Sequence, residues 1–154
     1  MRTSHRTQAR HKREQMPKWW RPKLDADQVM DCKVLHWDLL DRMTKGGATG
    51  QDLLDWIATG FTYSELMRLL DESKVVEFTP EARAAIAEQL DSYPGVMERF
   101  RTTGRVGFNS AQLLAARAAA EVMDQLIEMD RFGFSVRAAL WSEAAMKRIK
   151  GIST

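Results

Sequence analysis

Signals that start and stop helices recur every few turns along this chain, and they leave little room for other secondary structure. In a capping box, side chains three residues apart each bond a free backbone N–H of the other. Three such boxes are expected: Thr49 with Asp52, Thr62 with Glu65, and Asn109 with Gln112. Thr79 followed by Pro80 marks a fourth start, because Pro needs no N–H at the first helical position. The sequence therefore predicts short helices in close succession.

Apolar residues at helical spacing fill the segments between these signals. Asp25 or Asp27 is expected to cap the first helix and Ser135 the last, while Gly60 and Pro94 are expected to end helices. The predicted helices span 26–45, 50–58, 63–72, 80–91, 95–102, 110–131 and 136–149. No segment alternates polar and apolar residues long enough to predict a strand. The expected fold is all-α: an irregular compact bundle of six to seven helices with an extended basic N-terminal arm.

The charges are strongly segregated along the 154 residues. Residues 1–23 hold eight basic side chains and one acidic, residues 24–98 six basic and fifteen acidic, and residues 99–154 nine basic and five acidic. With 44% hydrophobic residues, the chain can bury a core. Two parts are therefore expected: a basic arm over 1–23, extended or disordered unless bound, and a helical domain over 24–154.

The single cysteine, Cys32, excludes an intramolecular disulfide and favours a reducing compartment. No apolar run reaches the length of a membrane span, and the charged start lacks the apolar stretch of a signal peptide. We therefore expect no membrane partner, and a location in the cytoplasm of a bacterial host cell or in a virion.

Catalytic patterns are scarce. The chain has no nucleophile elbow, Walker loop or dinucleotide fingerprint, so we expect a protein without enzymatic activity, cofactor or small-molecule ligand. Cys32 and His36 share a helix face but lack further metal ligands, and are interpreted as a small buried thiol beside a partly exposed imidazole. The acidic groups are interpreted as solvated helix faces: Asp38 with Asp41, Asp52 with Asp55, and Glu121 with Asp124 and Glu128.

Residues 49–71 resemble a DNA-binding helix-turn-helix over about twenty residues, with Gly60 at the turn. Two features depart from that motif. Trp56 stands where a small residue usually lets the helices approach, and the second helix offers no basic face. An ordinary helical hairpin is therefore the favoured interpretation.

The N-terminal arm carries the strongest functional signal. Its cations can neutralise phosphates, and its two adjacent tryptophans can stack on unpaired bases or anchor in a protein groove. The candidate nucleic-acid-binding residues are Arg2, Arg6, Arg10, Lys12, Arg13, Lys18, Trp19, Trp20, Arg21 and Lys23. The other interpretations are a contact with an acidic protein surface, including a second copy of the chain, and a solubilising tail whose tryptophans fold back onto the bundle.

Three short stretches resemble a group of uncharacterised small helical proteins encoded by phages and plasmids of proteobacteria. They are residues 20–23 (WRPK), residues 35–40, and residues 44–49 (TKGGAT) with Asp52 and Leu53 following. The similarity covers about residues 17–70. It implies an origin on a mobile element, and it brings no activity and no site residue with it.

These observations favour a non-enzymatic accessory or regulatory protein. Its basic arm would bind nucleic acid or a nucleoprotein, and its acidic bundle would bind protein. Two alternatives stay open: a structural or assembly protein of a virion, and an inhibitor of a host defence or nucleic-acid machine that acts through protein contacts alone.

Overall fold

The computed structural model describes residues 24–74 and 76–152. It contains five helices and no strand within those ranges. The helices are α2 (Ala26–Lys45), α3 (Gly50–Glu72), α4 (Pro80–Thr103), α5 (Ser110–Glu128) and α6 (Phe134–Ile152). The predicted all-α class is confirmed, while the number of helices in the described part is lower than the predicted six to seven.

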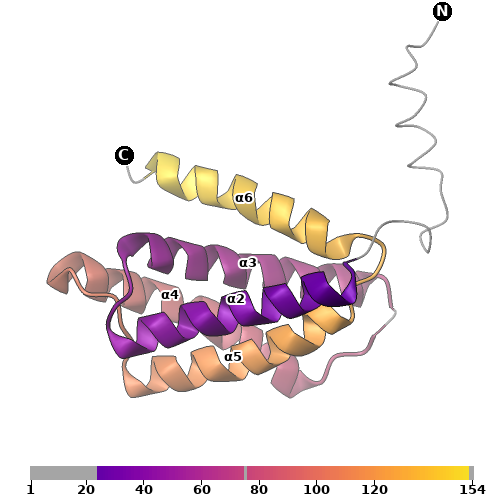
Figure 1. Cartoon of the computed structure of the whole chain (residues 1–154), viewed down its shortest axis with the longest axis horizontal. Coiled ribbons are helices and arrows are strands. Elements are labelled where there is room, and N and C mark those ends of the chain that lie inside the picture. Colours follow the sequence, from indigo (N-terminus) through magenta and orange to yellow (C-terminus); the bar gives the residue numbers. More distant parts are fainter. Residues whose placement is uncertain (1–23, 75, 153–154) are drawn as a thin grey trace, which may run out of the picture.

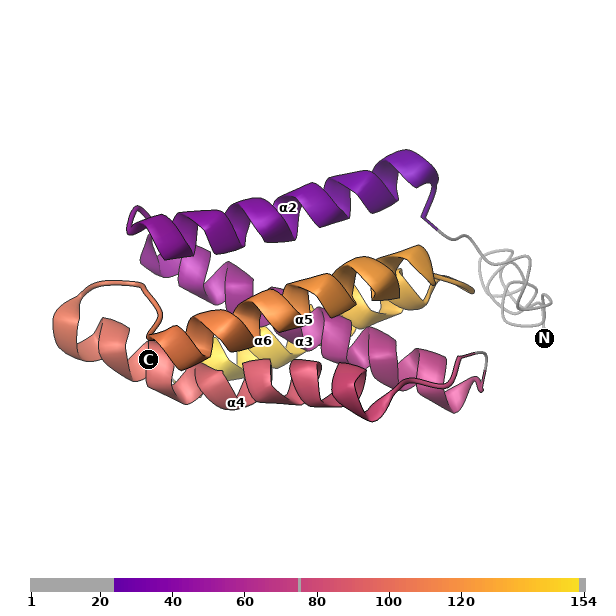
Figure 2. The ribbon, with the colours of Figure 1, turned by 90° about the horizontal axis from the view of Figure 1, so that it is seen from below.

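Helices α2 to α5 form an up-and-down bundle in which each helix contacts the next and α5 closes back on α2. Figure 2 shows α2 on one side of α5 and α4 on the other. The fifth helix, α6, lies outside this ring and packs mainly on α3. Because α6 packs on α3 and makes few contacts with α2, parts of α2 and α3 that face α6 stay uncovered.

Four of the predicted helix starts are confirmed by their hydrogen bonds. Asp25, Thr49, Thr79 and Asn109 each cap a helix with the side chain. At Asn109, for example, Oδ1 accepts from the Gln112 backbone N–H at 2.8 Å. Such caps contribute about 1 kcal/mol each, so local hydrogen bonds stabilise four of the five helix N-termini in the described part.

Gly60 was expected to end a helix, and this prediction is wrong: α3 runs unbroken from Gly50 to Glu72. Thr62, expected to cap a new helix, bonds the Ala58 carbonyl one turn back at 2.9 Å instead. The glycine serves close packing. A Cβ built on Gly60 would lie 1.5 Å from the Tyr93 hydroxyl of α4. The favoured helical hairpin over residues 49–71 is therefore wrong, and the resemblance to a helix-turn-helix is not borne out either, because α3 has no turn there.

Pro94 was expected to separate two helices, and α4 instead continues through it to Thr103. An interior proline costs a backbone hydrogen bond and about 3 kcal/mol. Buried residues on both sides of Pro94 offset that cost, because Gln89, Tyr93 and Val96 all face the core. Tertiary burial thus overrides the local preference.

The start of α6 differs from the prediction that Ser135 caps it. The helix begins at Phe134, and Ser135 lies in its first turn. The Ser135 N–H donates to Asp130 Oδ1 at 3.0 Å, so Asp130 supplies the cap. The predicted helix over 110–131 also ends earlier, at Glu128.

The core extends along both halves of the bundle, with α3 at its centre. One cluster gathers around Leu66, Leu70 and Leu126, and a second around Trp56 and Val96. Helix α3 contacts all four other helices, which explains why buried residues occur on every side of it. None of the described helices is both long and apolar enough to cross a membrane.

Candidate functional site: an apolar groove between α2 and α6

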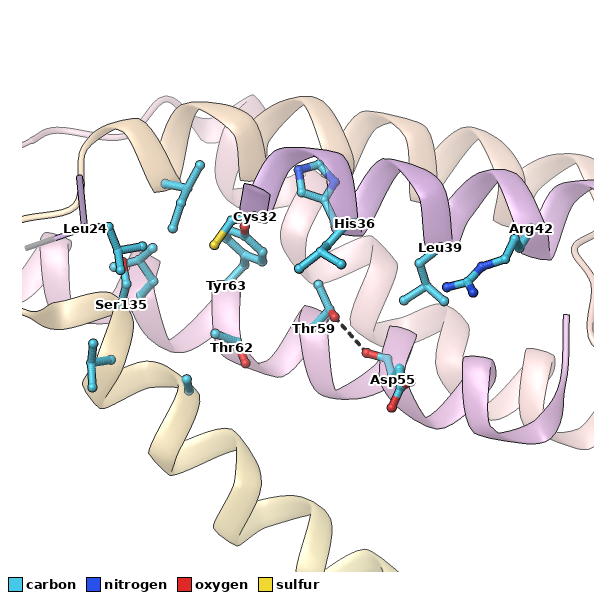
Figure 3. Close-up of a pocket in the computed structure, with 15 residues that line it drawn as sticks. Leu24, Cys32, His36, Leu39, Arg42, Asp55, Thr59, Thr62, Tyr63 and Ser135 are labelled. Carbon is cyan, nitrogen blue, oxygen red and sulfur yellow. Dashed lines mark hydrogen bonds between the residues drawn. The ribbon is translucent and has the colours of Figure 1, made fainter. Parts of the chain in front are cut away.

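A groove of about 420 Å³ opens between α2 and α6, with α3 as its floor (Figure 3). Its narrow end lies at Leu24 and Ser135, and its open end lies at Arg42 and Asp55. From Leu24 to Arg42 the α2 wall is about 27 Å long at 1.5 Å per residue. The groove is therefore long enough to hold a short peptide segment.

The lining of the groove is largely apolar, and two of its aliphatic side chains remain open to solvent. Leu35 on α2 is 68% exposed, and Val136 on α6 is 52% exposed. Both lie in the wall of the groove, above the buried Leu39 and Leu66. A large exposed apolar side chain alone is ordinary, but two of them on opposite walls of one hollow indicate a binding surface.

Asp130 fixes the narrow end of the groove. Its carboxylate is buried, and it accepts hydrogen bonds from the Leu24 N–H at 2.9 Å and from the Ser135 N–H at 3.0 Å. One side chain thus holds the chain entering α2 against the first turn of α6. The two helices are pinned together there, and the groove widens away from this point.

The two threonine hydroxyls on the floor donate hydrogen bonds to backbone carbonyls. The Thr59 hydroxyl donates to the Asp55 carbonyl at 2.7 Å (Figure 3), and the Thr62 hydroxyl donates to the Ala58 carbonyl. Burial raises the pKa of Tyr63 and also that of the Cys32 thiol. Both therefore stay protonated at neutral pH, when they are weak nucleophiles and weak bases.

Behind the α2 wall, His36 and Trp37 share one carboxylate of α5. Asp124 Oδ1 lies 2.7 Å from His36 Nε2, and Asp124 Oδ2 accepts from Trp37 Nε1 at 2.9 Å. A carboxylate can only accept, so His36 donates from Nε2; burial lowers the pKa of the imidazole below its ordinary value, so Nδ1 carries no proton at neutral pH. Nδ1 is buried and has no hydrogen-bond partner among the described residues. The imidazole is thus held neutral as part of the wall.

Two predictions about these residues are corrected. His36 was expected to be partly exposed beside a buried thiol, whereas His36 is buried and Cys32 is half-buried in the groove. Asp124 was expected on a solvated face, yet it joins α5 to α2. Contacts between distant helices cause both differences, and spacing within one helix does not reveal them.

The α2 side of the groove is acidic, whereas α6 on the other side carries four basic side chains and one acidic. Asp31 and Asp38 lie four residues before and three residues after Leu35, so they flank it on the same face of α2. Across α2 and α3 there are nine acidic and four basic side chains. Arg42, at the open end, is partly neutralised by Asp38 and Asp52 at 3.5 and 3.6 Å. A ligand that combines apolar and positive groups would complement this surface.

No cluster of three or more His, Cys, Asp or Glu side chains that could hold a metal occurs within the described ranges. The candidate nucleic-acid-binding residues all lie outside these ranges: Arg2, Arg6, Arg10, Lys12, Arg13, Lys18, Trp19, Trp20, Arg21 and Lys23. They stay a prediction. The groove itself was missed by the sequence reasoning, since Leu35 and Val136 follow the apolar spacing of their helices like any core residue.

Comparison of the chain with protein-family models, with curated proteins and with solved structures finds no match.

Proposed function

We propose that this protein is a non-enzymatic accessory protein with two binding surfaces. The groove between α2 and α6 binds a basic amphipathic helix of a partner protein, and the N-terminal segment 1–23 binds nucleic acid or a nucleoprotein. The observation that carries the proposal is the open apolar groove with Leu35 and Val136 exposed on its two walls. A small regulator of a nucleic-acid machine, encoded by a phage or plasmid, would use such a pair of surfaces.

The shape and the charge of the groove support a helical partner. A helix of about 14 residues spans about 21 Å, which fits within the length of the α2 wall. Leucines on one face of such a helix would cover Leu35 and Val136, and lysines beside them would approach Asp31 and Asp38. Apolar burial then supplies the affinity, and the charges supply orientation and faster association.

The floor chemistry supports a binding role over a catalytic one. The Thr59 and Thr62 hydroxyls are bonded to backbone carbonyls, while Cys32 and Tyr63 are held in their protonated forms. The floor of the groove thus presents apolar surface without an activated nucleophile.

A peptide-binding measurement tests the groove. The probe is a fluorescent helical peptide of about 14 residues with leucines on one face and lysines on the other. We expect L35E to weaken binding at least tenfold, because it places a charge in the apolar wall. The matched control is L114E, since Leu114 on α5 is also 68% exposed and lies outside the groove.

Both variants add one negative charge, so simple attraction of the lysines would strengthen binding to both. Equal affinities for L35E, L114E and the unaltered chain would place the peptide elsewhere and overturn the proposal.

A further inference from the structure

The chain carries, directly before the groove, a segment with the chemistry that the groove would bind. Residues 17–23 read PKWWRPK, with two tryptophans, three basic residues and two prolines. The segment joins the described part at Leu24, and Leu24 itself lines the narrow end of the groove. We infer that Trp19 and Trp20 of the same chain dock in the groove when no partner occupies it. This inference rests on the proposed function.

The reach of the segment matches the position of the exposed apolar wall. Trp19 lies five residues before Leu24 and so reaches at most about 17 Å from it when the backbone is extended. Leu35 lies eleven residues after Leu24, about 16 Å along α2. Trp20, four residues before Leu24, reaches at most about 14 Å from it, and Cys32 lies about 12 Å from Leu24 along α2. The two indoles can therefore cover the stretch from Cys32 to Leu35.

The position of Leu24 keeps the segment close to the groove. Its N–H is fixed by the buried Asp130 carboxylate, so the preceding residue leaves from the narrow end beside Ser135. A tether of four or five residues gives an effective concentration in the millimolar range. Even a weak interaction of the segment with the groove then suffices for occupancy.

Charge complementarity favours this occupant over a second copy of the chain. Lys18, Arg21 and Lys23 surround the tryptophans, while Asp31 and Asp38 flank Leu35 on the rim. A second copy with its α2 against this α2 would bring the two acidic sides together. The docked segment would also withdraw its own cations from nucleic acid, so the two surfaces of the protein would compete for it.

Methyl NMR on the full chain tests the docking. Methyl protons that lie over an indole ring resonate upfield, so the signals of Leu35 and Val136 should be shifted in the unaltered protein. In W19S/W20S they should move to ordinary positions, while the Leu114 methyls should stay unchanged. Identical Leu35 and Val136 signals in both proteins would overturn the inference.

The peptide used to test the groove provides a second readout. We expect W19S/W20S to bind it on the order of tenfold more tightly than the unaltered chain, because the tethered competitor is gone. Unchanged affinity, with L35E still weakening it, would reject self-docking and leave the groove function standing. Failure of every variant to bind the peptide, W19S/W20S included, would instead reject the proposed function.

Discussion

His36 on α2 and Asp124 on α5 are joined by a 2.7 Å contact between Nε2 and Oδ1 that lies behind the wall of the groove. It links α2, the helix that forms this wall, to its neighbour α5. The same carboxylate receives the Trp37 N–H, so one side chain positions two neighbouring residues of α2. The shape of the groove therefore depends on an interaction outside it.

Replacing Asp124 by alanine removes the acceptor for both donors. The buried His36 N–H loses its partner, and an unsatisfied buried donor costs about 1–3 kcal/mol. We expect D124A to lower the free energy of unfolding by about 2 kcal/mol in urea denaturation. E121A on the same helix is the control, because Glu121 is exposed and has no hydrogen bond among the described residues. An effect of D124A no larger than that of E121A would mean that the contacts of Asp124 with His36 and Trp37 add no net stability.

The stability of the protein should fall in mild acid because of His36. Burial lowers its pKa below the ordinary value of 6.5, with Lys33 acting in the same direction, and these effects outweigh the opposing effect of Asp124. The unfolded chain then binds more protons than the folded protein just below pH 6.5, so stability is complete above that value and is lost as the pH falls through it. Denaturation between about pH 7.5 and 5.5 should show this loss, and H36Q should reduce the slope. If stability falls equally steeply with pH in H36Q and in the unaltered protein, titratable groups other than His36 cause the loss.

Gly60 should tolerate no larger residue while Tyr93 is present. In G60A the new Cβ would overlap the Tyr93 hydroxyl, which must then move in a tightly packed core. The net loss should be about 2 kcal/mol or more, even though alanine favours the helix by about 1 kcal/mol. G60A/Y93F should recover part of the loss. G47A provides the comparison, because nothing lies within 4 Å of a Cβ at Gly47. Thermal melting of the four proteins measures the effects, and equal melting of G60A and G47A would contradict the packing argument.

Nucleic-acid binding should depend on the basic segment and on salt. Fluorescence anisotropy with single- and double-stranded oligonucleotides gives the affinity at several salt concentrations. In the variant R10S/K12S/R13S the log–log slope should fall by about 2–3 if each lost cation had neutralised one phosphate. R117S/R131S removes two exposed arginines of the helical part and should change the slope less. Absence of binding to either oligonucleotide even at low salt would remove nucleic acid from the proposed function.

The sequence predicted the class of the fold and the helix ends that depend on local chemistry. Asn109 and Gln112 cap α5 through two reciprocal hydrogen bonds within four residues. The start of this helix therefore depends only on nearby residues and could be predicted. Gly60 and Pro94 were misinterpreted because each usually ends a helix when only neighbours along the chain are considered. Here the close approach of α3 and α4, and the burial of Tyr93, decide the outcome.

The groove could not be predicted for a related reason. Leu35 and Val136 occupy apolar positions of amphipathic helices, and such positions are normally covered. They stay exposed because α6 packs mainly on α3 and diverges from α2 beyond Asp130. The angle between two helices far apart in sequence is a tertiary property, and no spacing along either helix encodes it on its own.

The claim that the groove is the protein-binding surface is tested most directly by a methyl NMR titration of the full W19S/W20S chain with the leucine–lysine peptide. The account predicts that the signals of Leu35 and Val136, on opposite walls, shift together and saturate at the same peptide concentration, while those of Leu114 stay fixed. Shifts at Leu114, or a titration in which neither Leu35 nor Val136 responds, would contradict it.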